Sequence, residues 1–182
     1  SIPSNQILEN PEMLKMLKIK LINPEGERQI VLHRTDIAAF KGISFPLASV
    51  PDNVKPLLEP GEFVEAQDPA IVEIAKEIVK DEKDALTASL RILEWVNHNI
   101  KPIPTSSLPS AVQVLQTRSG DCNEYTTLYT ALARAAGIPT RMAAGLVYQQ
   151  GRFFYYSWPQ IYLKGKWLSL DPTFGQVPAD VT

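Results

Sequence analysis

The only cysteine of the chain, Cys122, lies in the stretch that most constrains the fold, residues 117–136. Turn-forming residues at 119–121 precede it, and the residues after it carry apolar side chains at helical spacing on one face. Gly137 and Pro139 are typical of the end of such a helix. The sequence therefore predicts a helix of about four turns with Cys122 at its N-terminus.

A cysteine at a helix start has two interpretations. The unpaired N–H groups there carry a partial positive charge, which stabilises a thiolate and lowers the thiol pKa. A lone cysteine is also commonly a small buried hydrophobic residue. Its place directly after the Gly120-Asp121 turn favours a nucleophile. A nucleophile of this kind needs a base nearby, which another part of the chain has to supply.

Composition limits the classes of function. With 182 residues, 45% hydrophobic and 21% charged, the chain is an ordinary globular protein of one domain, or one domain with an appendage. A net charge of −2 does not favour nucleic acid or an anionic membrane surface as partner. No apolar run reaches the roughly 20 residues that span a bilayer, and no signal peptide is visible. One cysteine excludes an internal disulfide and leaves periplasm, cell envelope and cytoplasm open.

The N-terminal part has a period of two. Leu17, Ile19 and Leu21 alternate with polar residues, a turn sequence follows at 23–26, and residues 28–33 read as a second strand. This pattern predicts a β-hairpin. An isolated hairpin is marginal in water, so we expect it either to dock on the core or to be the remnant of a larger upstream β-domain.

Residues 43–68 contain four prolines and little periodicity, which predicts an extended linker lying over the surface. The sequence is therefore divided into residues 1–66, with hairpin and proline-rich linker, and residues 67–182, with the core. The chain starts at Ser1 rather than Met and has a polar end, so we expect a piece of a longer protein.

The predicted core has helices first and strands afterwards. Asp68 is suited to cap a helix and Pro69 to begin it. After the cysteine helix the period changes from about 3.6 to two. Further helices are predicted at 84–99 and 110–116, and strands at 140–148, 153–163 and 167–170. This order predicts an α+β class in which N-terminal helices pack on an antiparallel β-sheet.

Three motifs carry a family resemblance. The first is Gly-Asp-Cys-Asn-Glu at 120–124, followed by Ala-Ala-Gly-Ile-Pro-Thr-Arg at 135–141. The second is the aromatic strand at 155–162, and the third is the segment 165–175 with its Asp-Pro-Thr. Residues from about 68 to 177 thus resemble the bacterial transglutaminase-like domain, a member of the transglutaminase and papain-like cysteine protease superfamily. The resemblance implies a papain-like core.

The resemblance also implies a Cys-His-Asp triad, in which the thiolate attacks a carbonyl, His moves the proton and Asp orients the imidazole. By position, Cys122 is the nucleophile and Asp171 the orienting acid. The family has His two residues before the tryptophan at Trp158, where this chain has Tyr156. The two histidines of the chain, His33 and His98, stand at no catalytic position of the family.

The replacement of imidazole by a phenol changes the chemistry. The reference pKa is about 10 for a phenol and about 6.5 for imidazole, so Tyr156 is a poor base at neutral pH. It also cannot form the ion pair that makes a papain-type thiol acidic. Enzymes that lack one triad member retain roughly 10³–10⁴-fold catalysis over water. Alternatively, Tyr155 and Tyr156 are ordinary aromatic residues of a half-buried strand.

Other candidate residues have structural alternatives. Gln116, six residues before Cys122, has the spacing of the oxyanion glutamine in papain-type proteases, but a solvated helix end explains it equally well. Trp158 and Tyr125 are candidate substrate contacts, with a core position as the alternative for Trp158. Family members often have His in place of Tyr125 and Glu in place of Gln160. No residues have metal-ligand spacing, and no cofactor is implied.

Three functions follow from these observations. The first is a transglutaminase-like domain that has kept Cys122 and Asp171, is catalytically impaired, and binds or scaffolds a peptide or protein. The alternative is an active cysteine-dependent peptidase or acyltransferase that acts on peptide or protein amides with a non-standard base. A third is a structural module of a larger envelope protein. The absent histidine favours the first, and the oligomeric state is left open.

Overall fold

The computed structural model describes residues 20–22, 29–31, 35–105, 109–149 and 152–179. The chain forms two compact units, residues 1–35 with 180–182, and residues 36–179. In the first unit, β1 (Lys20–Ile22) pairs antiparallel with β2 (Gln29–Val31), in agreement with the predicted pair of strands. The turn predicted at 23–26 lies outside the described residues.

The second unit contains four α-helices with side-chain caps. They are α3 (Pro69–Ile78), α4 (Ala85–Asn99), α5 (Ala111–Thr117) and α6 (Cys122–Ala135). Asp68 and Asp84 accept hydrogen bonds from the first turns of α3 and α4, and Ser110 forms a capping box with Gln113 at α5. Because a capped start satisfies N–H groups that the helix leaves unpaired, the predicted helix starts are confirmed.

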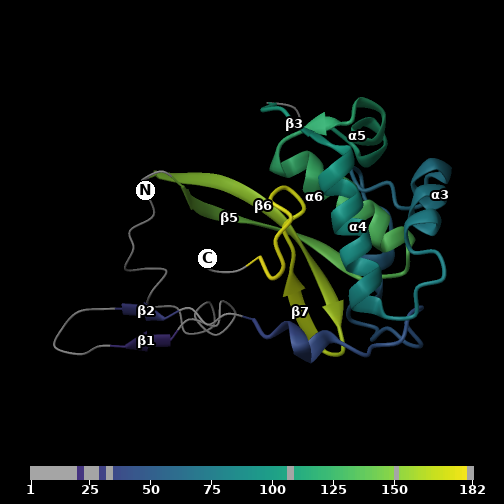
Figure 1. Ribbon diagram of the computed structural model, residues 1–182, viewed down its shortest axis with the longest axis horizontal. Coiled ribbons are helices and arrows are strands. Elements are labelled where there is room, and N and C mark those ends of the chain that lie inside the picture. Colours follow the sequence, from purple (N-terminus) through teal and green to yellow (C-terminus); the bar gives the residue numbers. More distant parts are fainter. Residues whose placement is uncertain (1–19, 23–28, 32–34, 106–108, 150–151, 180–182) are drawn as a thin grey trace. The chain divides into compact units, whose positions relative to one another are not determined.

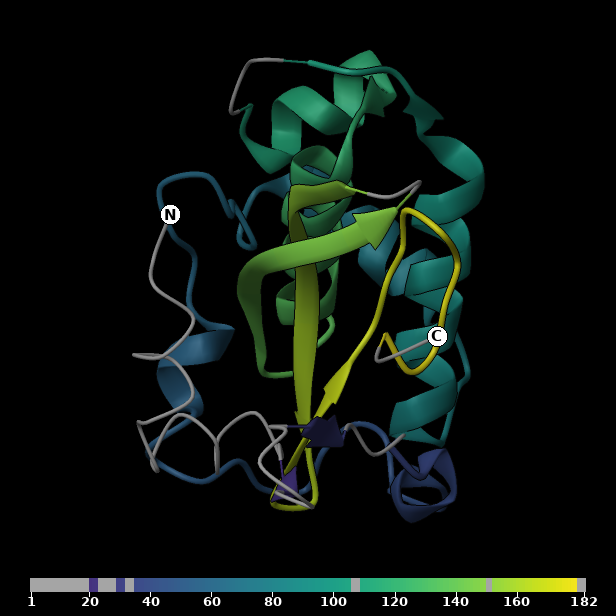
Figure 2. The same cartoon turned by 90° about the vertical axis from the view of Figure 1, so that its left-hand side faces the viewer.

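The sheet of this unit is antiparallel, in the order β5 (Thr140–Gln149), β6 (Arg152–Leu163), β7 (Lys166–Ser169). Figure 1 shows β5 and β6 as a long hairpin beside the helices, and Figure 2 shows β6 between its two neighbours. From Ser157 onward every second residue of β6 is buried. The intervening residues, beginning with Tyr156, are half-buried on the opposite face.

Helix α6 is the centre of the core. It contacts the three other α-helices, β5 and β6. Its side chains Leu128, Tyr129 and Leu132 are fully buried, as are Ile161 and Leu168 from the sheet. Each such side chain contributes about 1.5–3 kcal/mol relative to an exposed position. Helices therefore cover one face of an antiparallel sheet, and the predicted α+β, papain-like class is confirmed.

The proline-rich segment differs from its prediction. Residues 36–66 contain two short 3₁₀ helices, η1 (Ile37–Phe40) and η2 (Lys55–Leu58). Phe40, Phe45 and Val64 are buried in the common core, so this segment is more than a surface linker. The compact unit accordingly starts at residue 36 rather than at 67. The segment has no periodic pattern because its buried residues lie in a short 3₁₀ helix or in irregular structure.

Candidate active site

The turn before Cys122 is held by a short parallel pairing that the sequence did not predict. β4 (Ser119–Gly120) pairs with β3 (Lys101–Pro102), directly after α4. A Cβ atom at Gly120 would lie 2.2 Å from Cβ of Glu124, because the glutamate side chain folds back over the turn. Only glycine fits there, which accounts for the first residue of the Gly-Asp-Cys-Asn-Glu motif.

The next residues of the motif cap the helix. The carboxylate of Asp121 accepts a hydrogen bond from the Asn123 N–H at 3.0 Å. In return, the Asp121 N–H donates to Oε2 of Glu124 at 2.8 Å, which completes a capping box. Burial raises the pKa of Glu124, whose Oε1 has no partner in the described part of the chain. The motif thus places Cys122 as the first residue of α6.

The thiol of Cys122 is nearly buried, with 9% of the residue exposed. Burial raises its pKa, and the negative charges of Asp121 and Glu124 add to the increase. Ser157 acts in the opposite direction, because its backbone and side-chain donors favour the thiolate and limit the increase. This direction is opposite to the one expected from the helix start alone, because desolvation and two nearby carboxylates raise the thiol pKa.

Tyr156 and Asp171 form a direct pair. The phenol O–H lies 3.0 Å from Oδ1 and 2.9 Å from Oδ2 of Asp171, and the Tyr156 ring stacks on Phe174. Burial raises the pKa of Tyr156 far above its ordinary value, and the charges of Asp171 and of an ionised Cys122 raise it further. Tyr156 and Asp171 are thus in direct contact, the charge of an ionised Cys122 reaches the phenol, and the phenol is a donor there.

Asp171 is 5% exposed and is held by its own turn. Its Oδ1 accepts N–H bonds from Thr173 at 2.9 Å and Phe174 at 3.0 Å. Burial raises the pKa of its carboxyl, and these donors together with Tyr156 limit the increase. From α4, Asn97 donates to the carbonyl of Pro172 at 2.8 Å. The Asp-Pro-Thr turn therefore has a structural role as well as a position in the site.

Two predicted substrate contacts have different surroundings. Trp158 is half-buried, and a Cβ atom on Gly145 would lie 2.8 Å from its ring, so the indole packs on the β5 backbone. Its Nε1 has no hydrogen-bond partner among the described residues. Tyr125 is 1% exposed, and its hydroxyl donates to the carbonyl of Ile100 at 2.6 Å. Tyr125 therefore presents no surface to a substrate and belongs to the core.

The remaining candidates lie outside this cluster. Gln116 is in the last turn of α5 with an exposed side chain, and its role as an oxyanion donor remains a prediction. His98 is exposed at the end of α4, where Nδ1 lies 2.7 Å from the carbonyl of Glu94 one turn earlier. His33 falls outside the described residues. Within the described ranges, no three His, Cys, Asp or Glu side chains gather as metal ligands.

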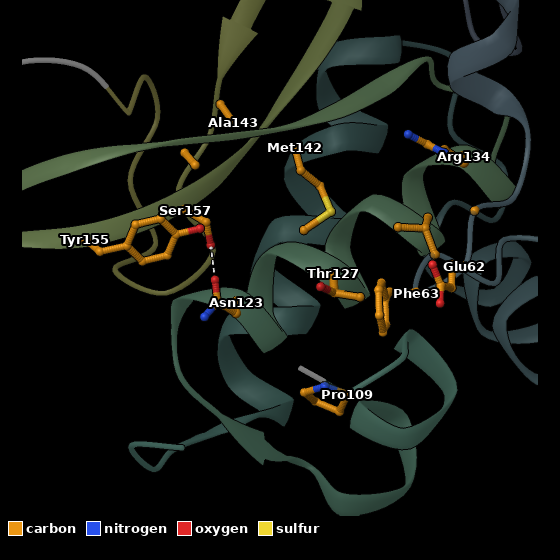
Figure 3. A pocket seen from close by; sticks show the side chains of 13 residues that line it. Glu62, Phe63, Pro109, Asn123, Thr127, Arg134, Met142, Ala143, Tyr155 and Ser157 are labelled. Atoms are coloured by element: carbon orange, nitrogen blue, oxygen red, sulfur yellow. Dashed lines mark hydrogen bonds between the residues drawn. The ribbon is translucent and has the colours of Figure 1, made fainter. Parts of the chain in front are cut away.

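A pocket of about 370 Å³ is lined by Asn123, the residue after Cys122, and by Ser157, the residue after Tyr156. It lies between α6, the hairpin β5–β6 and the segment at 61–64 (Figure 3). The Ser157 hydroxyl lies 3.0 Å from Oδ1 of Asn123 and 3.1 Å from the Cys122 carbonyl. Sequence reasoning missed both residues, although each directly follows a predicted site residue.

A family model matches the chain, and solved structures share its fold. A sequence model of the transglutaminase-like superfamily matches residues 72–172. A candidate cysteine protease from Cytophaga hutchinsonii has a similar structure, with TM-score 0.66, 20% identity, and 86% of this chain and 62% of that chain covered. The periplasmic domain of TgpA from Pseudomonas aeruginosa, bound to ethylmercury, is also similar in structure. Its TM-score is 0.54 and its sequence identity 23%, and the match covers 70% of this chain and 51% of that chain.

The chain thus spans less than two thirds of the length of these solved structures. A search of curated proteins gives no significant match. None of the helices in the part described by the structure is long and apolar enough to cross a membrane.

Proposed function

The chain belongs to the transglutaminase-like superfamily, and from this premise we propose that it is a catalytically impaired member that acts by binding a peptide or protein. One observation carries the proposal: the phenol of Tyr156 donates a hydrogen bond to the carboxylate of Asp171, at the position where the family has imidazole. Cys122 and Asp171 are present, whereas a phenol stands at the position of the group that moves the proton.

The chemistry of the three groups supports this proposal. Attack on an amide by Cys122 needs a thiolate, but burial raises the thiol pKa. The Tyr156 phenol keeps its proton because burial and nearby negative charge raise its pKa as well. It therefore neither accepts the thiol proton nor supplies the positive charge of an imidazolium. Acylation of the thiol is slow for both reasons, and later protonation of a leaving amine lacks its usual donor.

The experiment is a turnover assay with a fluorogenic peptide amide and, separately, with incorporation of a fluorescent amine into a glutamine-containing protein. We expect the unmodified chain to match Cys122→Ala in both. Tyr156→His should raise turnover by about 10²–10⁴-fold, the usual contribution of a general base. Tyr155→His is the matched control, because Tyr155 is 63% exposed and does not contact Asp171 in the described structure.

Turnover by the unmodified chain that Cys122→Ala abolishes would overturn the proposal. The function would then be that of an active peptidase or acyltransferase with a non-standard base, and His98 would be the first residue to replace.

A further inference from the structure

The outer edge of β5 presents backbone groups that no strand pairs. Next to the facing residues Thr140 and Ile161 of the β5–β6 ladder, the N–H of Tyr162 donates to the carbonyl of Pro139 at 2.9 Å. Because hydrogen-bonded and non-hydrogen-bonded pairs alternate, Thr140 and Ile161 are a non-hydrogen-bonded pair. The backbone N–H and C=O groups of each residue point away from the other strand. The carbonyl of Thr140 indeed accepts a bond from Arg134, at the outer edge.

The same alternation applies two and four residues further along β5. Met142 faces Pro159 and Ala144 faces Ser157, and both are therefore also non-hydrogen-bonded pairs. The N–H and C=O groups of Met142 and Ala144 point outward, where β5 is the edge strand of its sheet. In the described part of the chain, no other segment forms a ladder with these four groups. They form a short template for one more strand.

The pocket borders this edge. Three consecutive residues of β5, 142–144, line it, although alternate side chains of a strand point to opposite faces. In Figure 3 Met142 points into the pocket and Ala143 points away from it, so the backbone of β5 forms part of the wall. Met142 and Phe63 are 42% and 43% exposed and give the pocket an apolar surface.

The pocket has one charged side chain of each sign, and the one without a hydrogen-bond partner in the described part of the chain is a carboxylate. Two charged residues line it, Arg134 and Glu62. The guanidinium of Arg134 is held by the carbonyls of Thr140 and Glu59, at 2.9 Å and 2.6 Å, and burial lowers its pKa. Glu62 is exposed, and no ion pair of the described residues includes it. A cationic side chain is therefore the complement of this pocket.

We propose that an extended peptide pairs with the outer edge of β5 as a fourth strand, bonded to the backbone of Met142 and Ala144. A bulky apolar side chain of the peptide packs against Phe63 and Met142, and a lysine or arginine two residues away, on the same face of the peptide strand, pairs with Glu62. Main-chain bonds supply affinity and the pocket supplies selectivity, as in other strand additions. This inference rests on the proposed binding function and identifies its ligand class.

The test selects random heptapeptides on the immobilised full chain and measures the enriched ones by fluorescence anisotropy. We expect an apolar residue two positions away from Lys or Arg, so that both side chains lie on one face of the strand. Ala144→Pro should weaken binding about tenfold, since it removes one outward N–H and leaves the β6 ladder intact. Leu146→Pro is the matched control, because it makes the same change at an outward position of β5 that does not line the pocket.

Two further comparisons identify the contacts. Alternate backbone N–H groups of a paired peptide point toward β5 and away from it. N-methylation of those that point toward β5 should abolish binding, whereas N-methylation of the others should leave it unchanged. Glu62→Lys should change the selected peptides from basic to acidic, whereas Glu77→Lys on the exposed side of α3 should not.

Several results would overturn the inference. They are the absence of any enriched peptide, equal binding by the chain and its Ala144→Pro variant, insensitivity to methylation, or a self-association of the chain that Ala144→Pro abolishes. The last result would assign the edge to a second copy. The proposed loss of catalysis is decided separately by the turnover assay, so either proposal can fail alone.

Discussion

Tyr156 has a hydroxyl that donates to a carboxylate and a ring that stacks on Phe174. The bond favours the ionised form of Asp171 and is one of the causes that limit the rise of its pKa. At the scale of one residue, the phenol therefore serves as the hydrogen-bond partner of the aspartate, as the family histidine does. It does not take over the proton transfer that the histidine performs.

Tyr156→Phe should lower the free energy of unfolding by about 1–3 kcal/mol, because a bond to a charged, buried acceptor is lost. The loss should be largest at neutral pH. It should shrink as the pH falls through the Asp171 pKa, which lies above the ordinary range, because a protonated carboxyl gains less from the phenol. Urea unfolding at several pH values measures this, with Tyr155→Phe as control. A pH-independent loss would contradict it.

The sequence identified the residues of the triad positions but not the sign of the thiol pKa. Cys122, Tyr156 and Asp171 follow from motif order, and the structure brings them together. The pKa depends on how deeply Cys122 is buried and on the Ser157 donors, and both are set by the packing of β6 on α6. These are contacts across 35 positions of the chain, which local pattern does not encode.

At the scale of elements, the N-cap Asp121 both stabilises the start of α6 and influences the reactivity of Cys122. Asp121→Ala should lower the free energy of unfolding by about 0.5–2 kcal/mol, since it removes the N-cap. The same change should speed alkylation of Cys122 at neutral pH, because the Asp121 charge contributes to the raised thiol pKa. Urea unfolding and the iodoacetamide rate measure the two effects.

Asp68→Ala is the control for this prediction, since it removes the cap of α3 without a charge beside Cys122. It should lower stability and leave the alkylation rate unchanged. A slower alkylation in Asp121→Ala would contradict the assigned electrostatics.

The helices and strands were predictable because each has a local signal: acidic caps at Asp68 and Asp84, and alternation in β5 to β7. Two features have no such signal. The β3–β4 pairing joins two residues from each side, and residues 36–66 bury side chains without a period. Both depend on tertiary packing, which decides structure where propensity is weak.

At the scale of the whole molecule, the compact unit includes the segment from residue 36 onward. Phe40→Ala should therefore cost about 3–5 kcal/mol, the usual loss for a buried phenylalanine, because Phe40 is 2% exposed. Phe63→Ala, at a 43% exposed position of the same segment, should cost much less. Urea unfolding of the two variants measures the difference, and equal, small losses would show that the segment lies outside the core.

The most direct measurement of the central claim is the rate of Cys122 alkylation by iodoacetamide as a function of pH. Without an imidazolium partner, the rate should follow a single ionisation with a midpoint above the ordinary thiol pKa, because burial raises it. Tyr156→His should move that midpoint to lower pH, so that a reactive plateau extends from the new midpoint up to neutral pH. A plateau at low pH in the unmodified chain would show that Cys122 already has an ion-pair partner, and would contradict the claim that Tyr156 leaves it unactivated.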